Sequence, residues 1–340
     1  MDTILTAANN SLRVEFGGSM RYDHSYVVGQ RRQWAAGAHL TRQSDLDAMS
    51  VSLRLTCDGD FDATLWTGQA GTMIFVRYAG VPLQAERTAQ HLGDMLSGYV
   101  MLTVVLRGHW AGFQGGREFD ATAGEAMATR FDQTFLLLTK SPDIDTLEIY
   151  YPLSMFGAAG VNPEEVNRQS WTLSTLTMSA IEFVIAALDD SSMNHPIRAA
   201  RLDGMMVRTA MLILDDFRIA THGTVVEHDD VRMRVIDLIG ADFRDPELSA
   251  ETIAKRLSIS PRSLFRAFEK SGLTINQLIR DTRLDHAAFE LAEAGSTKTI
   301  AAIAHSHGFS GADTFSRAFR LRFHESPSQF RRRTRVPVTT

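Results

Sequence analysis

The chain has 340 residues, which is enough for two domains, and its formal net charge at pH 7 is −5. A hydrophobic content of 44% with 22% charged residues is typical of a soluble globular protein. No stretch approaches 18 consecutive apolar residues, and the first residues lack the basic start and apolar core of a secretory signal. Cys57 is the single cysteine, which excludes an intrachain disulfide and fits a reducing cytoplasm.

Residues from about 50 to 153 are expected to form β-structure. Short runs with β-branched or aromatic residues are separated by clusters of Gly, Asp or Pro, such as "GFQGGREFD" and "KSPDID". The clearest runs are "VSLRLTC", "TMIFVRYAG", "YVMLTVVLRGHW", "EAMATRF" and "TFLLLTK". Several short strands at this spacing predict an antiparallel sandwich or barrel.

The pattern changes to helix from about Asn162 to Ala220. "NPEEVNRQ" starts with a cap residue and a Pro in the first turn, and two longer segments then carry apolar residues three and four positions apart. Two interpretations stay open for these helices, because their apolar faces could pair with a second subunit or cover the sheet of their own chain. The faces contain Ile181, Val184, Ile185, Met206, Met211 and Leu214. The short polar segment "RIATHGTVVEHDD" then predicts a linker.

The last third of the chain contains a sequence repeat. "TIAKRLSIS" (252–260) matches "AIAHSHGFS" (302–310), and "RAF" at Arg266–Phe268 returns at Arg317–Phe319. Each copy has the form helix, tight turn, helix. In the first copy Ser249 is the expected N-cap of the first helix, and Ser260 with Pro261 begins the second. Gly308 takes the turn in the second copy.

This is the layout of a helix-turn-helix unit, whose second helix enters the major groove of DNA. A purely structural hairpin is the alternative for a single unit, but two units in a basic region favour binding to a polyanion. Residues 241–340 hold 16 Lys and Arg against 11 Asp and Glu, whereas the preceding 240 residues hold 19 against 29.

The spacing of the two units supports the same interpretation. The segment "TINQLIRDTRLDHAAFELAEAG" between them can form a helical rod of roughly 30 Å. One turn of DNA measures about 34 Å. The two second helices could therefore lie in successive major grooves on one face of a duplex.

These motifs resemble those of the AraC/XylS family of bacterial transcription regulators. "ETIAKRLSISPRSLFRAFEKSGLT" is similar to the family's first unit, and "IAAIAHSHGFSGADTFSRAFRLRFHESPSQFRR" carries its signature, with "A..GF", "F.R.F" and the closing "SPS.FR". The acidic first two-thirds resembles the cupin-like sensor half, with helices, of many members. The resemblance implies an α+β multidomain chain, with an N-terminal β-sandwich or cupin-like barrel and an all-α C-terminal domain. Its expected parts are a sensor over 1–160, a helical connector or dimerisation region over 161–220, a linker over 221–229 and a tandem helix-turn-helix domain over 230–335.

The resemblance also implies which residues contact DNA. Base contacts are expected from Arg262, Phe265, Arg266, Asp313, Thr314 and Arg317. Guanidinium groups suit guanine O6 and N7, a carboxylate favours cytosine N4, and Phe265 could contact a thymine methyl group. A surface ion pair is the alternative role for Arg266 and Arg317.

Other side chains of the two units have different expected roles. Phosphate contacts are expected from Ser260, Ser263, Lys298, Thr299 and Arg320. Core positions are expected for Leu264, Phe268, Phe315 and Phe319.

The β-region contains no recognisable catalytic or metal-binding motif. His91 and His109 are isolated, and no His-x-His with a following Glu is present. The glycines from Gly108 to Gly116 lack the context of a phosphate loop and favour a hairpin turn. A ligand pocket in this region would take aromatic walls and an anion anchor from Trp66, Tyr78, Arg107 and Trp110, which could equally be core aromatics and a surface arginine.

The sequence therefore predicts a cytoplasmic, sequence-specific DNA-binding transcription regulator that is not an enzyme and uses no metal or cofactor. The resemblance implies activation through RNA polymerase, a homodimer, no membrane association and a small-molecule effector acting on the N-terminal domain. One alternative is a ligand-independent regulator whose N-terminal half only dimerises or binds a protein partner. An enzyme with a DNA-binding appendage is the other, and the missing catalytic motifs disfavour it.

Overall fold

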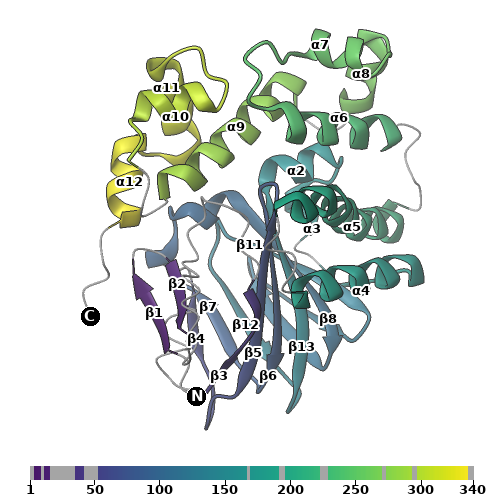
Figure 1. The fold of residues 1–340 in the computed structure, drawn as a ribbon. Coiled ribbons are helices and arrows are strands. Elements are labelled where there is room, and N and C mark those ends of the chain that lie inside the picture. The colour runs from purple at the N-terminus through teal and green to yellow at the C-terminus, as the bar shows by residue number, and fades with distance from the viewer. Residues whose placement is uncertain are drawn as a thin grey trace.

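The computed structural model describes residues 4–8, 11–15, 35–41, 53–166, 169–190, 196–222, 229–269, 273–292 and 297–335. The sheets of the N-terminal half form the lower part of the molecule in Figure 1, and the helices of the last third lie above them. Helices of the middle region cover one side of the sheets. The α+β architecture predicted from the sequence is confirmed.

The described residues of the N-terminal half form two large antiparallel sheets and a separate two-stranded sheet. The seven-stranded sheet has the order β14-β11-β8-β13-β6-β5-β3, the five-stranded sheet has the order β10-β9-β12-β7-β4, and β1 pairs with β2. The strands are β1 (Ile4–Ala8), β2 (Ser11–Glu15), β3 (Ala35–Leu40), β4 (Arg54–Thr56), β5 (Ala63–Ala70), β6 (Met73–Gly80), β7 (Gln84–Arg87), β8 (Tyr99–Arg107), β9 (His109–Gln114), β10 (Arg117–Thr122), β11 (Glu125–Arg130), β12 (Phe135–Thr139), β13 (Ile144–Pro152) and β14 (Trp171–Thr172).

Strand β8 lies inside the seven-stranded sheet and is covered on both faces. Met101 and Val105 belong to the cluster between the two sheets, whereas Val100, Leu102 and Val104 belong to the cluster under the helices. Since alternate residues of a strand point to opposite faces, a strand buried on both sides needs apolar residues at nearly every position. This accounts for the continuous apolar run "YVMLTVVL".

The glycine-rich segment after Gly108 forms a hairpin, as predicted. Gly115 and Gly116 connect β9 to β10 and have φ values of 61° and 78°. Two central residues with positive φ are characteristic of the tight turns that match the twist of a hairpin, and glycine adopts them without a steric penalty.

The described chain also contains helices, which predominate after β13. They are η1 (Ala89–His91), η2 (Met95–Gly98), α2 (Leu153–Ala158), α3 (Pro163–Val166), α4 (Thr175–Asp189), α5 (Pro196–His222), α6 (Asp229–Asp242), α7 (Ala250–Arg256), α8 (Pro261–Phe268), α9 (Ile275–Ala292), α10 (Ile300–Ser306), α11 (Ala312–Phe323) and α12 (Pro327–Arg335). Helix α5 continues to His222, into the segment expected as a linker, and α6 begins at Asp229.

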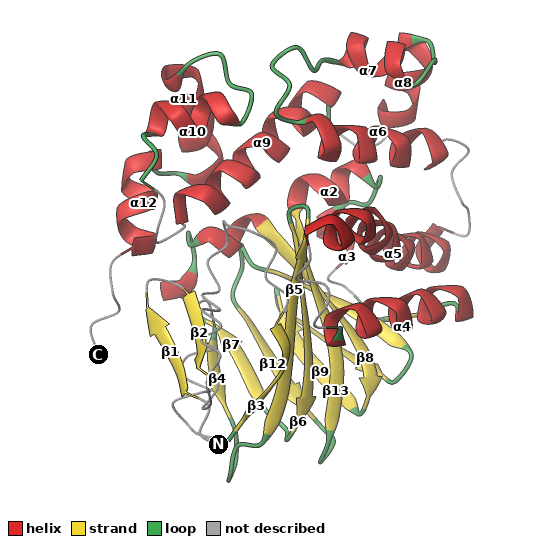
Figure 2. Ribbon diagram, in the orientation of Figure 1, coloured by secondary structure: helices red, strands yellow, loops and turns green. Residues whose placement is uncertain are grey.

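Helices α4 and α5 pack on the outer face of the seven-stranded sheet (Figure 2). Ile181, Val184, Met206 and Leu214 are 0% exposed and share a cluster with sheet residues. Met211 is 3% exposed in the same cluster, and Ile185 packs against it. These apolar faces cover the sheet of their own chain, so the interpretation that they pair with a second subunit is wrong.

Candidate nucleic-acid interface

The first helix-turn-helix unit consists of α7 and α8. At the start of α7, the Ser249 hydroxyl accepts from the amide of Thr252 (3.3 Å), and the Thr252 hydroxyl accepts from the amide of Ser249 (2.8 Å). At the start of α8, the Ser260 hydroxyl accepts from the amide of Ser263 (3.0 Å), and Pro261 occupies the first turn. Both caps satisfy amides that lack partners within the helix, as the sequence predicted.

The second unit, α10 and α11, has the same plan. The Thr299 hydroxyl accepts from the amide of Ala302 (3.1 Å) at the start of α10. Gly308 has a φ of 75°, and Ser258, at the equivalent place in the first unit, has a φ of 55°. A Cβ at Gly308 would lie 2.9 Å from the carbonyl oxygen of Phe243, so glycine is required there by both conformation and space.

Helix α9 joins the two units. It has 18 residues, which corresponds to a length of about 27 Å. The units stand towards its two ends, on the side of the molecule away from the sheets (Figure 2). This arrangement matches the rod that the sequence predicted.

The recognition helix of the first unit, α8, has one buried and one exposed face. Leu264 and Phe268 are buried in the core, as expected. Arg262, Phe265 and Arg266 are exposed, and Phe265 is 53% exposed although its side chain is large and apolar. A large aromatic ring held out in water beside two arginines is suited to contact with another surface.

Helix α11 repeats this division. Phe315 and Phe319 are 0% exposed, whereas Asp313, Thr314 and Arg317 are exposed. Within the described part of the chain, neither Arg317 nor its counterpart in α8, Arg266, forms an ion pair. The guanidinium groups are therefore available to an external partner.

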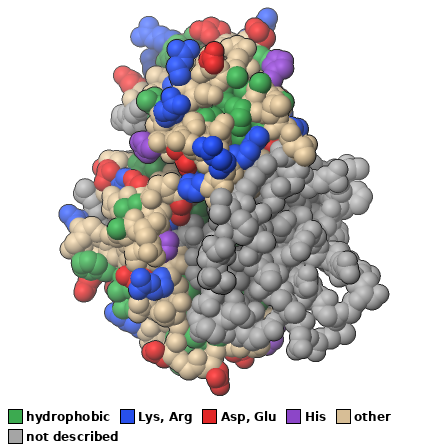
Figure 3. All heavy atoms as spheres, turned by 90° about the vertical axis from the view of Figure 1, so that its left-hand side faces the viewer, with side chains coloured by type: hydrophobic (Ala, Val, Ile, Leu, Met, Phe, Trp, Pro, Cys, Tyr) green, Lys and Arg blue, Asp and Glu red, His purple; other side chains and the backbone are tan. Residues whose placement is uncertain are grey.

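The five residues expected at phosphates lie around the starts and ends of these helices. Ser260 and Thr299 are N-caps, and the Ser263 hydroxyl lies 2.8 Å from that of Ser260. Arg320 is exposed on α11. Lys298 precedes α10, and its Nζ lies 2.6 Å from the Glu290 carboxylate, so this ion pair would compete with a phosphate contact. Lys and Arg side chains are frequent over the helical upper half of the face drawn in Figure 3.

Three buried or half-buried arginines support the units, and sequence reasoning did not identify them. Arg232 of α6 donates to the carbonyl oxygens of Ala267 in α8 (2.5 Å) and Ala159 after α2 (3.2 Å). Arg283 of α9 donates to the carbonyl oxygen of Phe243 (2.8 Å). Arg322 of α11 forms a bidentate ion pair with Asp285 of α9, in which Nε donates to Oδ1 (2.8 Å) and Nη2 donates to Oδ2 (2.9 Å).

The Arg322–Asp285 pair is enclosed by protein. Burial raises the pKa of Asp285 to about 6, and the nearby Arg322 counteracts this rise. An arginine on the buried side of an amphipathic helix is the sequence signal that could have pointed to Arg232 and Arg322.

The four residues suggested for a ligand pocket in the β-region do not form one group. Tyr78 and Trp110 lie in the cluster between the sheets. Trp66 faces the helices instead, and its Nε1 donates to Asp189 of α4 (2.9 Å). Arg107 is exposed and pairs with Asp143 at 3.0 Å. The four residues lie on four different strands, and the position of each residue along its strand decides which face of the sheet it occupies.

The described residues lack two further kinds of feature. No helix there is long and apolar enough to cross a membrane. No group of three or more His, Cys, Asp or Glu side chains there is arranged to hold a metal ion.

Two helix-turn-helix units with exposed recognition helices, joined by one long helix, define a DNA-binding domain. Residues 253–333 match the family model described as a helix-turn-helix domain. Through this domain the chain is similar to AraC-type transcription regulators, and its last third is a DNA-binding domain of the kind that such regulators carry.

Two relatives from Escherichia coli illustrate the similarity. YijO of strain K12, an HTH-type transcriptional regulator, is 34% identical over 93 residues, which are 27% of this chain and 32% of YijO. RhaR of strain O139:H28, an HTH-type transcriptional activator, is 23% identical over 251 residues, which are 72% of this chain and 86% of RhaR. These relatives are regulators, in keeping with the expectation that the chain is not an enzyme.

Among solved structures, the AraC-like transcriptional activator CuxR matches with a TM-score of 0.42 and 17% identity, over 72% of this chain and 93% of CuxR. ToxT from Vibrio cholerae, in a structure with (E)-4-(8-methylnaphthalen-1-yl)but-3-enoic acid bound, matches with a TM-score of 0.34 and 14% identity, over 72% of this chain and 91% of ToxT.

Proposed function

We propose that the protein reads two successive major grooves with α8 and α11. The observation that carries this proposal is the exposure of both recognition faces at the two ends of one helix about 27 Å long. Arg262 and Arg266 of α8 and Arg317 of α11 would contact guanine edges, and Asp313 would accept from a cytosine amino group. Thr314 and Phe265 would complete the base contacts, the latter against a thymine methyl group.

The helix N-termini would fix this arrangement on the DNA backbone. The first amides of α8 and α10 would approach phosphates together with Ser260, Ser263 and Thr299. Arg320 and Lys298 would add charge, the latter after leaving Glu290. These contacts carry no sequence information but set the register in which the base-reading side chains meet the grooves.

The remaining parts of the proposal concern the N-terminal half. Residues 1–160 would form the sensor for a small-molecule effector, 161–220 the connector, 221–229 the linker and 230–335 the DNA-binding domain. The protein would activate nearby promoters through RNA polymerase, and the description of its relative RhaR as an activator supports this role. It would act in the cytoplasm as a homodimer. Because the apolar faces of α4 and α5 are covered, a homodimer would use another surface.

The test is selection of binding sites from a random duplex library by the purified full-length protein. The proposal predicts a motif with two informative segments about 10 base pairs apart, and a logarithm of affinity that falls linearly with the logarithm of salt concentration. A single informative segment, or sequence-indifferent binding, would contradict it.

A further inference from the structure

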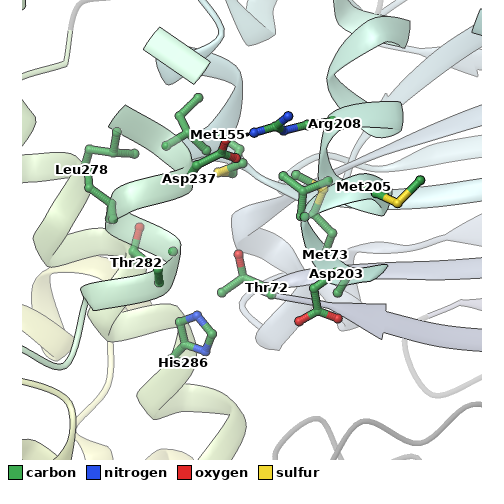
Figure 4. Close-up of a pocket in the computed structure, with 18 residues that line it drawn as sticks. Thr72, Met73, Met155, Asp203, Met205, Arg208, Asp237, Leu278, Thr282 and His286 are labelled. Carbon is green, nitrogen blue, oxygen red and sulfur yellow. Dashed lines mark hydrogen bonds and ion pairs between the residues drawn. The ribbon is translucent and has the colours of Figure 1, made fainter. Parts of the chain in front are cut away.

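A cavity of about 560 Å³ lies where the DNA-binding half meets the N-terminal half (Figure 4). Its walls come from the turn between β5 and β6, from α2 and α5, and from α6 and α9. Small-molecule sites in proteins have volumes of roughly 300–1,000 Å³. A molecule bound here would therefore contact, at the same time, the sheet and the helix that joins the two helix-turn-helix units.

Three uncharged polar side chains line the cavity. Thr72 lies in the turn between β5 and β6, and Thr282 and His286 lie one turn apart on α9. Figure 4 shows Thr282 and His286 on one side of the space and Thr72 across from them. Neither the two hydroxyls nor the imidazole forms a hydrogen bond with another residue of the described chain. Since polar groups away from bulk water normally have a hydrogen-bond partner, these three groups are available to a bound molecule.

The His286 side chain is uncharged at neutral pH. Its ring stacks on that of Phe243, with 3.9 Å between the centroids, and burial lowers its pKa to about 3. A neutral imidazole has one N–H that donates and one ring nitrogen that accepts, and a threonine hydroxyl can do both. The polar part of the lining therefore suits a neutral group that donates or accepts hydrogen bonds.

The charged groups of the lining already have partners. Arg208 of α5 and Asp237 of α6 form an ion pair at 2.7 Å, and Asp203 also has an interaction partner. A charged ligand would lose its hydration on entry and would find no unpaired opposite charge in the lining. The lining thus selects against both cations and anions.

The rest of the lining is mostly apolar. Its apolar side chains include Met73, Met155, Val207, Ile236 and Leu278. Methionine side chains are flexible and polarizable, so they adapt to rings and chains of different shape. Gly204 of α5 and Gly240 of α6 also line the cavity, and a Cβ at either position would meet no atom within 4 Å. These glycines leave the space beside the two helices unfilled.

We propose that this cavity binds a small uncharged molecule with an apolar body and a hydroxyl, carbonyl or amide group, with that group between Thr72 and the Thr282–His286 pair. The inference rests on the proposed effector response and names the site and chemical class of the effector. Because the walls come from both halves, the bound molecule favours the arrangement in which α9 is docked on the sheet. That arrangement sets the position of both helix-turn-helix units, since α9 joins them.

The test compares three probes that share a phenylbutyl body: 4-phenylbutan-1-ol, 4-phenylbutylamine and 4-phenylbutyrate. Calorimetric titration of the full-length protein at about pH 7 is expected to show binding of the alcohol. Both charged probes are expected to bind at least about ten-fold more weakly, because a buried charge without a partner is costlier than a satisfied hydroxyl.

Two variants test the polar contacts. His286→Phe keeps a ring that can stack on Phe243 but removes both nitrogens, and Thr282→Val removes a hydroxyl at nearly constant shape. Each is expected to weaken binding of the alcohol by about three- to ten-fold, the effect of one lost hydrogen bond. The matched control Thr175→Val changes an exposed threonine of α4 outside the cavity and should leave the affinity unchanged.

A further variant tests the location by volume. Gly204→Leu places a side chain in the cavity and is expected to abolish binding of the alcohol, while Gly204→Ala should reduce it less. The inference is overturned if the alcohol does not bind at about 5 mM or if either charged probe binds as tightly as the alcohol. It is also overturned if binding of the alcohol is unchanged in Gly204→Leu or in both His286→Phe and Thr282→Val.

DNA binding by the same preparations is measured in parallel and shows that each variant is folded. Specific DNA binding by the wild type without binding of the alcohol overturns this inference alone. Sequence-indifferent DNA binding by the wild type overturns the proposed function.

Discussion

The two helix-turn-helix units share one plan but are supported differently. In the first unit, Ile253, Leu264 and Phe268 belong to a cluster that continues through α6 and α5 to the seven-stranded sheet. In the second unit, Phe315 and Phe319 belong to a separate cluster built with α12 and the second half of α9. The first unit is thus continuous with the N-terminal half, whereas the second has a core of its own.

The polar contacts follow the same division. Arg232 connects the end of α8 directly to Ala159, next to α2. Arg322 of the second unit pairs with Asp285 of α9 and so holds the second unit to the shared helix. Helix α9 also touches the sandwich, where Phe289 lies edge-on to Tyr99. The first unit therefore reaches the N-terminal half through α6, whereas the second unit meets it through α9 and through contacts of α11 with η2.

The largest effect is expected from a core substitution that destabilises one helix-turn-helix unit and not the other. Phe319→Ala removes a fully buried ring and should destabilise the second unit by about 3–5 kcal/mol. Hydrogen exchange should then rise in α10 to α12 and stay low in α7 and α8. The matched variant Phe268→Ala should raise exchange in the first unit and also in α5 and α6. Equal loss of protection in both units from Phe319→Ala would contradict the division.

The exposed faces of α8 and α11 should contribute equally to the free energy of DNA binding, although the two units have different cores. Arg266→Ala and Arg317→Ala are each expected to weaken binding to a selected site by about 1–3 kcal/mol. The two losses should add, since the side chains lie on separate units. Fluorescence anisotropy measures them, and Arg54→Ala, an exposed sheet arginine, is the control. An effect confined to one unit would mean that one recognition helix does not read DNA.

Removing the contacts of Arg232 should have a smaller but measurable effect on stability. Arg232→Met removes the donors to two buried carbonyl oxygens and should lower the free energy of unfolding by about 2 kcal/mol in urea titrations. Arg117→Met serves as the control because Arg117 is exposed on β10, and its expected effect is below about 0.5 kcal/mol. If both variants behave alike, Arg232 is not a special link between the first unit and the N-terminal half.

The smallest effect concerns pH. Since the folded protein holds the pKa of His286 near 3, below its usual 6.5, the unfolded chain binds the proton more readily between these values. Stability from this residue is therefore lost as pH falls below about 6.5, by about 1.4 kcal/mol at pH 5.5. Thermal melts of wild type and His286→Gln should converge towards acid. A constant difference between them from pH 7 to 5.5 would contradict the prediction.

The DNA-binding half was largely predictable because its signals are local. Caps such as Ser249 and Ser260, the turn at Gly308 and the buried spacing of Phe315 and Phe319 depend on residues three or four positions apart. The exposed residues of α8 and α11 were expected from the resemblance to the family rather than from spacing.

The N-terminal half was less predictable because its contacts are distant in sequence. Nothing near Trp66 indicates that it faces Asp189, 123 residues away. The apolar stripes of α4 and α5 fit a sheet or a second subunit equally well until the sheet is in place. The cavity between the halves was also beyond prediction, since Thr72, Asp203 and His286 come from three separate segments.

The most direct test of the central claim varies the spacing between the two segments of a selected DNA site. Inserting five base pairs turns the second segment to the opposite face of the duplex. Because α9 is a single helix of 18 residues fixed to both units, affinity is expected to fall to that of one segment alone. Retention of full affinity after the insertion would show that the two units move independently and would contradict the rigid, two-groove reading.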